Sequence, residues 1–282
     1  MAMESVSILV RSRNDEPFAE VTFRSILEQD SPLPFEVISC DDASEDRTPE
    51  IIASFPEVKR LPRPEGPYLP GKRLNYMIRH CTGDIVVFNN ADAVPQNRSW
   101  LRNLVKPLLD GSADAVYANQ LARPDADWLV RKDNLRAFGD GRIAAQWRFF
   151  FSLASSAAGK DDLLRRPFDE EIRYSEDVEW AHRRPIRIAY AANALVEHSH
   201  NYTLQELKRR FYGEGYADGR IFGDRPALAR ELAAAARETL RDAFFLLKNP
   251  AGLPELPGAP VRRFCQRYAH WKGVRDYVRD HA

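Results

Sequence analysis

Residues 83–95, GDIVVFNNADAVP, contain the pattern that decides the architecture of this 282-residue chain. The run DIVVFN at 84–89 is short, almost continuously apolar and preceded by a glycine. Such a run is typical of a strand that is buried on both faces of a sheet. The polar loop Asn90-Ala91-Asp92 follows it directly. Because open α/β sheets bind ligands beyond the carboxyl ends of their strands, this loop is the first candidate for a binding site.

The same alternation of apolar strand and polar loop extends in both directions from this stretch. Further strands are expected over four intervals: 5–10 (SVSILV), 35–40 (FEVISC), 58–61 and 113–118. Apolar side chains at helical spacing predict helices over four others: 17–28, 48–55, 71–81 and 99–109. Strands and helices that alternate in this way predict an α/β fold with a mostly parallel central sheet.

The second half of the sequence changes character. Residues 134–151 are rich in aromatic side chains and are expected to be helical, and residues 174–183 are expected to form a helix with Ser175 as its N-cap. A last strand is expected over 187–196. After it the pattern is helical only, over 204–216, 226–247 and 261–278. We therefore expect a sheet domain over residues 1–203 and a helical C-terminal region over 204–282.

The charges are balanced overall but not along the chain. Lysine and arginine total 41, as do aspartate and glutamate, which argues against a uniformly basic nucleic-acid binder. From Leu204 onward, however, 15 basic residues stand against 10 acidic ones. This basic excess fits two interpretations, a surface that faces phosphates or an anionic membrane, and ordinary solvated helix faces.

The cysteines and the N-terminus bear on the compartment. Cys40, Cys81 and Cys265 are widely separated and form no disulfide or metal-binding pattern, which fits a reducing, cytoplasmic environment. The N-terminal sequence lacks the features of a signal peptide, and no apolar run approaches the 18 residues or so of a membrane span. Any membrane contact is therefore expected to be peripheral, at the inner face.

Three polar loops follow the predicted strands, and each has its own signature: Arg11-Ser12-Arg13-Asn14-Asp15, Asp41-Asp42-Ala43-Ser44 and Asn90-Ala91-Asp92-Ala93. Turn chemistry alone explains any one of them, because Asp, Asn and Ser favour turns. Their convergence at one sheet edge would instead bring together cations, carboxylates and small residues. That combination suits a phosphorylated ligand bound with a divalent cation, since magnesium and manganese prefer carboxylate and phosphate oxygens.

An ordered set of short motifs resembles the family 2 glycosyltransferases, which are inverting enzymes with a GT-A fold. The motifs are SILVRSRND at the N-terminus, CDDASEDRT at 40–48, GKRLN at 71–75, GDIVVFNNADAVP at 83–95, SEDVEWAHR at 175–183 and VEHSH at 196–200. The resemblance covers about residues 4–215. Within the family it is greatest with bacterial rhamnosyltransferases and other enzymes of polysaccharide or O-antigen synthesis.

The resemblance implies residues for the nucleotide-sugar donor. Asp41 would accept a hydrogen bond from a pyrimidine base, and Arg11, Arg13 and Lys72 would contact the base or the diphosphate. Asp92 would hold a metal ion, Mg²⁺ or Mn²⁺, that bridges the diphosphate, with Asn90 contacting the ribose or a metal-bound water. His198 would be the late metal ligand of the family, with His200 in reserve.

The resemblance also implies the general base. Asp177 would take the proton of the acceptor hydroxyl, with Glu176 as its neighbour and competitor for this task. The alternative is structural, because acids are favoured at a helix N-terminus by about 0.3–1 kcal/mol. Trp180 and Arg183, one turn further on, would line the acceptor side, although Trp180 suits the core equally well.

The sequence also departs from the family pattern. The first carboxylate of the family's D-x-D metal motif is Asn90 here, the usual aromatic of the first loop is Arg13, and a glycine of the second loop is Ala43. The lost charge at Asn90 keeps open a catalytically silent binding module. A nucleotidyltransferase, which also uses an α/β sheet with a metal carboxylate, has less support because the sequence has no glycine-rich, lysine-containing phosphate loop near the N-terminus. As partners, the resemblance implies a nucleotide sugar and a glycan or lipid-linked glycan acceptor. The basic C-terminal helices suggest a peripheral membrane contact or a homodimer.

Overall fold

The computed structural model describes residues 3–147, 149–183 and 185–281 and contains two compact units. Unit 1 comprises three segments, Met1–Arg123, Arg136–Glu171 and Glu176–His198. Unit 2 comprises Pro124–Leu135, Ile172–Ser175 and Ser199–Ala282. The largest segment of unit 2 begins at Ser199, and two upstream segments also belong to this unit. The domain division after residue 203 stays a prediction.

Unit 1 is built on an eight-stranded sheet in the order β3-β2-β1-β4-β7-β6-β8-β5. Its strands are β1 (Val6–Ser12), β2 (Phe35–Asp41), β3 (Val58–Arg60), β4 (Ile85–Asn90), β5 (Val94–Pro95), β6 (Ala115–Leu121), β7 (Ser155–Gly159) and β8 (Ile188–Glu197). The strands β3, β2, β1 and β4 are parallel neighbours, as expected. Strand β7 runs antiparallel between β4 and β6, so the sheet as a whole is mixed.

The prediction of a helix over residues 134–151 is wrong. Helix α5 spans Trp128–Ala137, a short 3-10 turn follows at Ala144–Gln146, and β7 begins at Ser155. Residue 148 of the expected helix lies outside the described residues. Strand β7 has the sequence SSAAG and its first four residues are buried. Its small side chains fit a central position between two strands but carry little strand propensity, which is why the sequence pattern does not reveal it.

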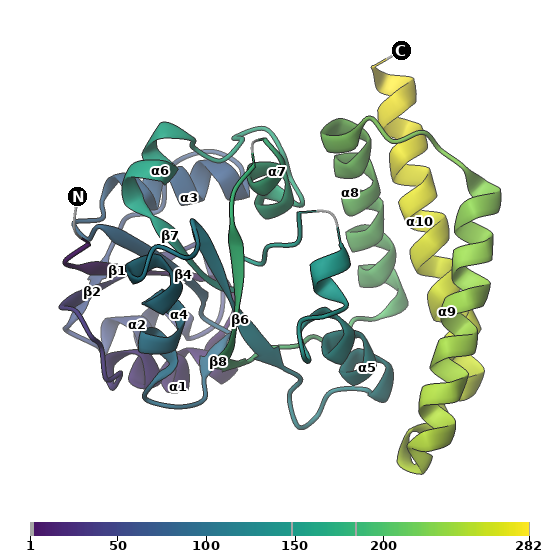
Figure 1. The fold of residues 1–282 in the computed structure, drawn as a ribbon, viewed down its shortest axis with the longest axis horizontal. Coiled ribbons are helices and arrows are strands. Elements are labelled where there is room, and N and C mark those ends of the chain that lie inside the picture. The colour runs from purple at the N-terminus through teal and green to yellow at the C-terminus, as the bar shows by residue number, and fades with distance from the viewer. Residues whose placement is uncertain (1–2, 148, 184, 282) are drawn as a thin grey trace. The chain divides into compact units, whose positions relative to one another are not determined.

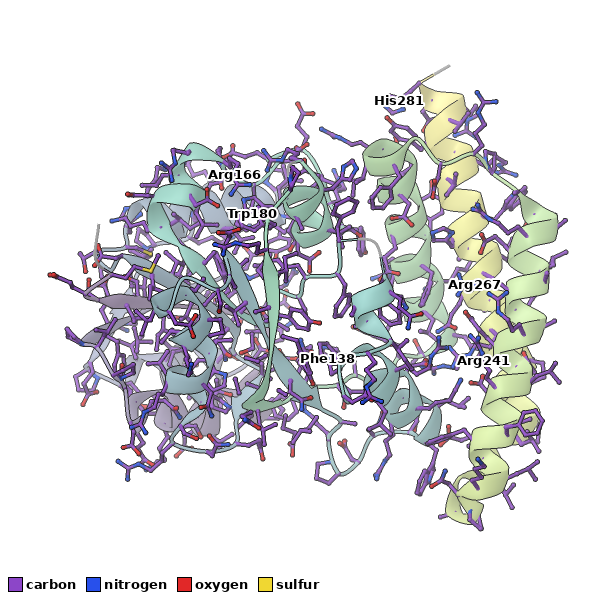
Figure 2. The ribbon with its side chains drawn as sticks, viewed as in Figure 1. Phe138, Arg166, Trp180, Arg241, Arg267 and His281 are labelled. Atoms are coloured by element: carbon purple, nitrogen blue, oxygen red, sulfur yellow. The ribbon has the colours of Figure 1, made fainter. Side chains whose placement is uncertain are left out.

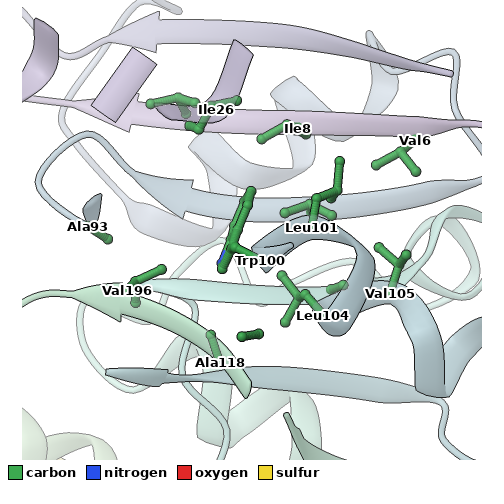
Figure 3. Packing of buried hydrophobic residues seen from close by; sticks show 14 of the residues in the cluster. Val6, Ile8, Ile26, Ala93, Trp100, Leu101, Leu104, Val105, Ala118 and Val196 are labelled. Carbon is green, nitrogen blue, oxygen red and sulfur yellow. The ribbon is translucent and has the colours of Figure 1, made fainter. Parts of the chain in front are cut away.

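Helices cover both faces of the sheet, because each buried strand sends alternate side chains to opposite sides. One face packs on α1 (Glu16–Leu27), α2 (Thr48–Ala53) and α4 (Trp100–Leu109), and the other on α3 (Pro70–Arg79), α6 (Lys160–Arg165) and α7 (Glu176–His182) (Figure 1). Trp100, Leu101 and Leu104 of α4 belong to the first cluster together with Ile8 of β1 (Figure 3). Trp180 of α7 is 1% exposed in the second cluster, so it belongs to the core.

Unit 2 is largely helical. Its long helices are α8 (Leu204–Phe222), α9 (Leu228–Lys248) and α10 (Ala259–Asp280), and a 3-10 segment at Pro250–Gly258 precedes α10. Thr203 starts α8 with a capping box, in which its hydroxyl accepts from the Glu206 backbone while the Glu206 carboxylate accepts from the Thr203 backbone. Helix α10 lies between α8 and α9 (Figure 1). None of the helices in the described residues combines the length and the apolar character needed to cross a bilayer.

Two glycines set the contact between α8 and α10. A Cβ at Gly215 of α8 would overlap the backbone carbonyl of His270, and one at Gly273 of α10 would overlap the backbone carbonyl of Tyr212. The two helix backbones therefore approach more closely than side chains would allow. Any larger residue at either position would force the helices apart.

Unit 2 buries charged side chains between α9, α10 and α5. The Asp242 side chain is fully buried and contacts Lys132 and Arg263. The Arg263 guanidinium also donates to both carboxylate oxygens of Asp133, at 2.7 and 2.9 Å. Arg267 of α10 reaches Glu238 of α9 (Figure 2). The interior of unit 2 therefore contains a network of ion pairs, whereas the interior of unit 1 is mainly apolar.

Candidate active site at the carboxyl edge of the sheet

The predicted loops converge because their strands are parallel neighbours. In the register of the sheet, Ser12 is paired with Asp41, and Arg11 is paired with Asn90. The last residues of β1, β2 and β4 therefore lie in adjacent positions along one edge. This edge carries the cations, amide and carboxylates that the sequence predicted as a site.

Arg11 is the central cation of this edge. Its Nη2 donates to Asn90 Oδ1 at 3.1 Å, and its Nη1 lies 3.6 Å from Glu176 Oε1. Burial on its own would lower the pKa of Arg11, but Tyr68 and the carboxylates of Glu176 and Asp177 outweigh it and raise the pKa above its usual value. Arg11 is therefore a permanent positive charge beside the acid pair of α7.

Arg11 is the hydrogen-bond partner of the Asn90 side chain. The amide oxygen accepts a hydrogen bond from the guanidinium, so the neutral side chain has a specific partner. A carboxylate at this position would form an ion pair with Arg11 and neutralise it. With an amide instead, Arg11 keeps its positive charge for Glu176 and for an anionic ligand.

Glu176 and Asp177 form the predicted acid pair at the start of α7. Burial, followed by the negative charge of Glu176, raises the pKa of Asp177 from 3.8 to about 7. The backbone N–H of Val178 donates to Asp177 Oδ1 at 2.9 Å and, with the Leu153 backbone and Arg11, limits this rise. A carboxyl group that titrates near neutral pH and is fixed by backbone donors is suited to general base catalysis.

A second group of predicted residues lies at the ends of β4 and β8. Asp92, His198 and His200 each offer one ligand atom, and these atoms lie within 4.8 Å of one another. His198 Nε2 is 3.5 Å from Asp92 Oδ1, and His198 Nδ1 is 2.8 Å from Gln120 Oε1. Since the Gln120 amide nitrogen donates to Ser152 Oγ, its oxygen faces His198 and accepts from Nδ1. This second hydrogen bond leaves Nε2 as the nitrogen that can bind a metal.

The donor set fits a divalent cation. One carboxylate and two imidazoles, with the first imidazole oriented by an amide, suit a first-row transition ion such as Mn²⁺, and Mg²⁺, which prefers oxygen ligands, would rely on Asp92. Arg123 Nη2 lies 3.6 Å from Asp92 Oδ2, and its guanidinium stacks on the Phe18 ring at 3.6 Å. Gln120 and Arg123 are functional candidates that the sequence patterns did not reveal, because both lie on or after the ordinary-looking strand β6.

The remaining predicted residues lie at the end of β2, after β1 and on α3. Asp41 accepts from Ser12 Oγ at 3.0 Å and from the Ser44 backbone N–H at 2.9 Å, so it shapes the loop. The Arg13 side chain is 62% exposed and lies 3.9 Å from Asp42. Lys72 is exposed on α3. Its cation is therefore accessible to a ligand.

Asp42 and Arg73 are a buried pair that the sequence analysis did not single out. Arg73 Nη2 donates to Asp42 Oδ1 at 2.7 Å, and Arg63 Nε donates to the same oxygen at 3.0 Å. Both side chains of the Asp42–Arg73 pair are at most 6% exposed. The pair fixes the second loop against α3. Its only sequence signal was the second Asp of the CDDAS stretch.

The residues expected on the acceptor side have structural partners. Trp180 Nε1 donates to the Arg166 carbonyl at 2.8 Å within the core (Figure 2). Arg183 is paired with Glu179 at 2.7 Å and donates to the Pro167 carbonyl. Trp180 therefore packs in the core behind α7, and the predicted acids Glu176 and Asp177 lie at the other end of the helix.

An α/β sheet with an acid pair and an Asp–His group at its carboxyl edge is the arrangement that the resemblance to glycosyltransferases predicts. The particular family follows from the sequence: the profile described as Glycosyl transferase family 2 matches residues 7–173. The chain therefore belongs to glycosyl transferase family 2, and the resemblance seen in its motifs is confirmed.

Two curated relatives extend over most of the chain. It is 24% identical over 269 residues to the O-antigen chain rhamnosyltransferase RfbN of Salmonella typhimurium strain LT2, covering 88% of this chain and 84% of that protein. It is 26% identical over 261 residues to the O-antigen chain rhamnosyltransferase WbaN of Salmonella anatum, covering 86% and 82%. These relatives agree with the subgroup that the motifs indicated.

Solved structures share the fold. The mannosyltransferase PcManGT from Pyrobaculum calidifontis, in complex with GDP-Man and Mn²⁺, superposes with a TM-score of 0.68 at 23% identity, covering 100% of this chain and 89% of that one. Glucosyl-3-phosphoglycerate synthase from Mycobacterium tuberculosis, in complex with phosphoglyceric acid, superposes with a TM-score of 0.56 at 20% identity, covering 77% and 80%. The expected α/β fold of GT-A type with a helical C-terminal region is thereby confirmed.

Proposed function

We propose that this protein transfers one sugar from a nucleoside-diphosphate sugar to a hydroxyl group of a glycan or lipid-linked glycan, with inversion at the anomeric carbon. The observation that carries the proposal is the acid pair of α7 beside Arg11, at the edge where three ligand-binding loops meet. A catalytically silent module would have no need for an acid whose pKa is tuned to about 7.

Asp177 is the proposed general base. Its carboxylate takes the proton from the acceptor hydroxyl as that oxygen attacks the anomeric carbon from the face opposite the leaving group. The bond between the anomeric carbon and the acceptor oxygen forms, the bond to the diphosphate oxygen breaks, and the nucleoside diphosphate departs with the electron pair. A pKa of about 7 suits this task, because the group is partly ionised at neutral pH yet still basic.

The donor diphosphate is proposed to lie at the edge of β1 and β4. Arg11 and Arg13 would face its negative charge, and Asp41 would face the base. Asp92 and His198, with His200, would hold Mg²⁺ or Mn²⁺. When bound, such an ion offsets the charge that develops on the leaving diphosphate.

The relatives support a range of donors and acceptors. Two are named O-antigen chain rhamnosyltransferases, which supports dTDP-L-rhamnose as donor and a growing glycan as acceptor. The structural neighbours include complexes with GDP-Man and with UDP-Glc, each with Mn²⁺, so a UDP-hexose is the second donor class to test. Family membership favours glycosyl transfer over nucleotidyl transfer.

The decisive variant is Asp177→Asn. We expect it to lower the transfer rate by about 10²–10⁴-fold, the usual contribution of a general base, while nucleoside diphosphate affinity stays within a few-fold of wild type. Asp161→Asn, an exposed acid on α6, is the matched control and should leave both properties unchanged. Full transfer activity in Asp177→Asn would eliminate the proposed base.

The first ligand measurement is thermal shift against UDP, dTDP, GDP and CDP, each with and without Mn²⁺. A ligand at about 100 times its dissociation constant adds about 2.7 kcal/mol to the stability of the state that binds it. A shift with one diphosphate that grows with Mn²⁺ supports the proposal and fixes the donor class. Donor binding with neither hydrolysis nor transfer would instead support the silent module that Asn90 left open.

A further inference from the structure

Helix α9 carries a row of large apolar side chains on its outer surface. Leu240, Phe244 and Leu247 are 63%, 68% and 62% exposed, and Leu232 is 41% exposed. Spacings of three, four and eight residues place these side chains along one face of the helix. Isolated exposed leucines are common in proteins, but a continuous row of this kind marks an interaction surface.

The opposite face of α9 is charged and buried. Glu231, Glu238 and Asp242 are 5%, 8% and 0% exposed. Arg267 contacts both glutamates, and Arg263 contacts Asp242. The usual orientation of an amphipathic helix is therefore reversed, since the acids face the protein and the apolar row faces outward.

A basic row runs beside the apolar one. Its members, spaced by seven, four and seven residues and all exposed, are Arg230, Arg237, Arg241 and Lys248. The three acids of α9 are the buried ones, so every exposed charge on this helix is positive. Phe244 is one turn from both Arg241 and Lys248, which places the edge of the apolar row next to the basic row.

Helix α10 presents a second apolar row that is rich in aromatic rings. Val261, Phe264 and Tyr268 are 55%, 50% and 38% exposed. The rings of Phe264 and Tyr268 stack at 5.7 Å, and the Tyr268 and Trp271 rings follow at 5.4 Å. The Arg275 guanidinium lies 4.8 Å from the Trp271 ring. Tyrosine and tryptophan with nearby arginine are typical of side chains at a membrane–water interface.

We propose that the outer faces of α9 and α10 bind the surface of an anionic lipid membrane. In this proposal the apolar rows enter the boundary between headgroups and acyl chains, and the basic row contacts the lipid phosphates. A lipid surface uses both features at once. A nucleic acid would match the basic row but leave the apolar rows in water.

The charge pattern argues against a second copy of the chain as the occupant. In a two-fold symmetric contact the same patch lies on both sides, so the basic row of α9 would come near its own equivalent. The acids of α9 are buried and paired with α10, Glu238 with Arg267 and Asp242 with Arg263, while Glu231 pairs both with Arg267 and with Arg230 of the row. Arg237, Arg241 and Lys248 make up the rest of the row. An anionic surface is complementary to the row, whereas a copy of this chain repels it.

The test is flotation of the full chain with lipid vesicles, which does not depend on sugar transfer. We expect binding to phosphatidylcholine vesicles that contain roughly 30 mol % phosphatidylglycerol, weaker binding to phosphatidylcholine alone, and weakening by salt over the range that screens surface charge. Leu240→Ser with Phe244→Ser should lower the partition coefficient at least about tenfold. Arg237→Gln with Arg241→Gln should lower it about fivefold per charge, only on anionic vesicles.

Matched controls come from exposed residues of unit 1. Val21→Ser with Leu164→Ser removes two exposed apolar side chains, 46% and 47% exposed, and Arg102→Gln with Arg79→Gln removes two exposed cations. Both control variants should float like wild type. Equal loss in the controls, or no flotation of wild type with either vesicle, overturns the proposal. So does light scattering that shows a dimer in wild type and a monomer in the Leu240→Ser, Phe244→Ser variant, because a second copy would then cover this face.

Discussion

The two units of this protein differ in where most of their charged residues lie. In unit 1, Ile8, Leu104 and Trp100 are wholly buried between the sheet and its helices, and the charged residues gather at the carboxyl edge. In unit 2, Asp242 and Arg263 are buried between helices, and Phe244 is exposed. An amphipathic helix sequence thus fixes which side chains share a face, but it does not fix which face turns inward.

The energetic consequences of the two arrangements differ. Apolar burial stabilises unit 1 in proportion to the area removed from water, about 25 cal/mol per Å². Buried ion pairs contribute little net stability, because desolvation offsets much of the attraction, yet breaking one leaves a buried charge without its partner. Unit 2 should therefore respond sharply to the loss of one charge and mildly to the loss of a whole cluster.

The largest expected effect follows from Asp242→Ala. This change leaves Lys132 and Arg263 buried with fewer compensating charges, and we expect it to lower the free energy of unfolding by about 3–5 kcal/mol. Urea unfolding followed by circular dichroism measures the change. Asp280→Ala, which removes an exposed partner of Arg279, should cost no more than about 0.5 kcal/mol. A small effect of Asp242→Ala would mean that the buried network does not support unit 2.

Replacement of Lys132, Asp242 and Arg263 together by apolar residues tests whether unit 2 needs these buried charges. The triple variant Lys132→Met, Asp242→Leu, Arg263→Met removes all three of these buried charges. The Asp133 side chain, which loses its partner Arg263, is 36% exposed and can be hydrated. We expect the variant to be as stable as wild type or more stable by about 1–4 kcal/mol, measured by the same urea transitions. A loss of stability as large as that of the single variant would show that the ion pairs themselves hold the helices together.

The acid pair of the candidate active site in unit 1 predicts a pH dependence. Asp177 has a pKa of about 7 in the native protein against 3.8 ordinarily, so between these values the native state holds a proton that the unfolded chain has released. The stability contributed by this group therefore falls as pH rises from about 4 to 7. Asp177→Asn removes the penalty, and its Tm advantage over wild type should grow across that window, by about 2–4 °C per kcal/mol, and then level off. An advantage that does not change with pH would contradict the raised pKa.

The smallest effect is expected at the outer face of α9. Phe244→Ser removes a large apolar side chain that is 68% exposed, so the free energy of unfolding should change by no more than about 0.5 kcal/mol. Leu104→Ala, in the core of unit 1, should cost about 2–5 kcal/mol although it removes fewer atoms. Thermal and urea unfolding of the two variants compare them directly. A cost for Phe244→Ser that approaches the core value would mean that its face is covered in solution.

The sequence predicted the parallel part of the sheet and the edge that carries the site. Strands β1, β2 and β4 were visible because they are continuous apolar runs with polar loops behind them, and the register of parallel strands then determines that Arg11 and Asn90 meet. The family motifs supplied Asp177 and His198. Strand β7 could not be predicted, because its serines and alanines carry no strand pattern and it is defined by the neighbours between which it fits.

Contacts between residues far apart in the sequence could not be predicted either. Gln120 orients His198 from 78 residues away, and Arg73 reaches Asp42 from 31 residues away. Nothing local distinguishes either residue, since one lies in a strand and the other in an amphipathic helix. In α9 the periodicity gave the helix and its apolar stripe, but the buried acids depend on Arg263 and Arg267 of a different helix.

The glycine contact between α8 and α10 limits how that helix pair can vary. With backbone against backbone at Gly215 and Gly273, α10 cannot turn about its own axis or slide by a residue without a clash. The rotation of α10 about its own axis is therefore fixed. As a result, two residues without a side chain set the direction in which Phe264 and Tyr268 point. The outward-facing rings can therefore be exchanged without altering this contact, whereas the direction that the whole row faces depends on the absence of a Cβ at Gly215 and Gly273.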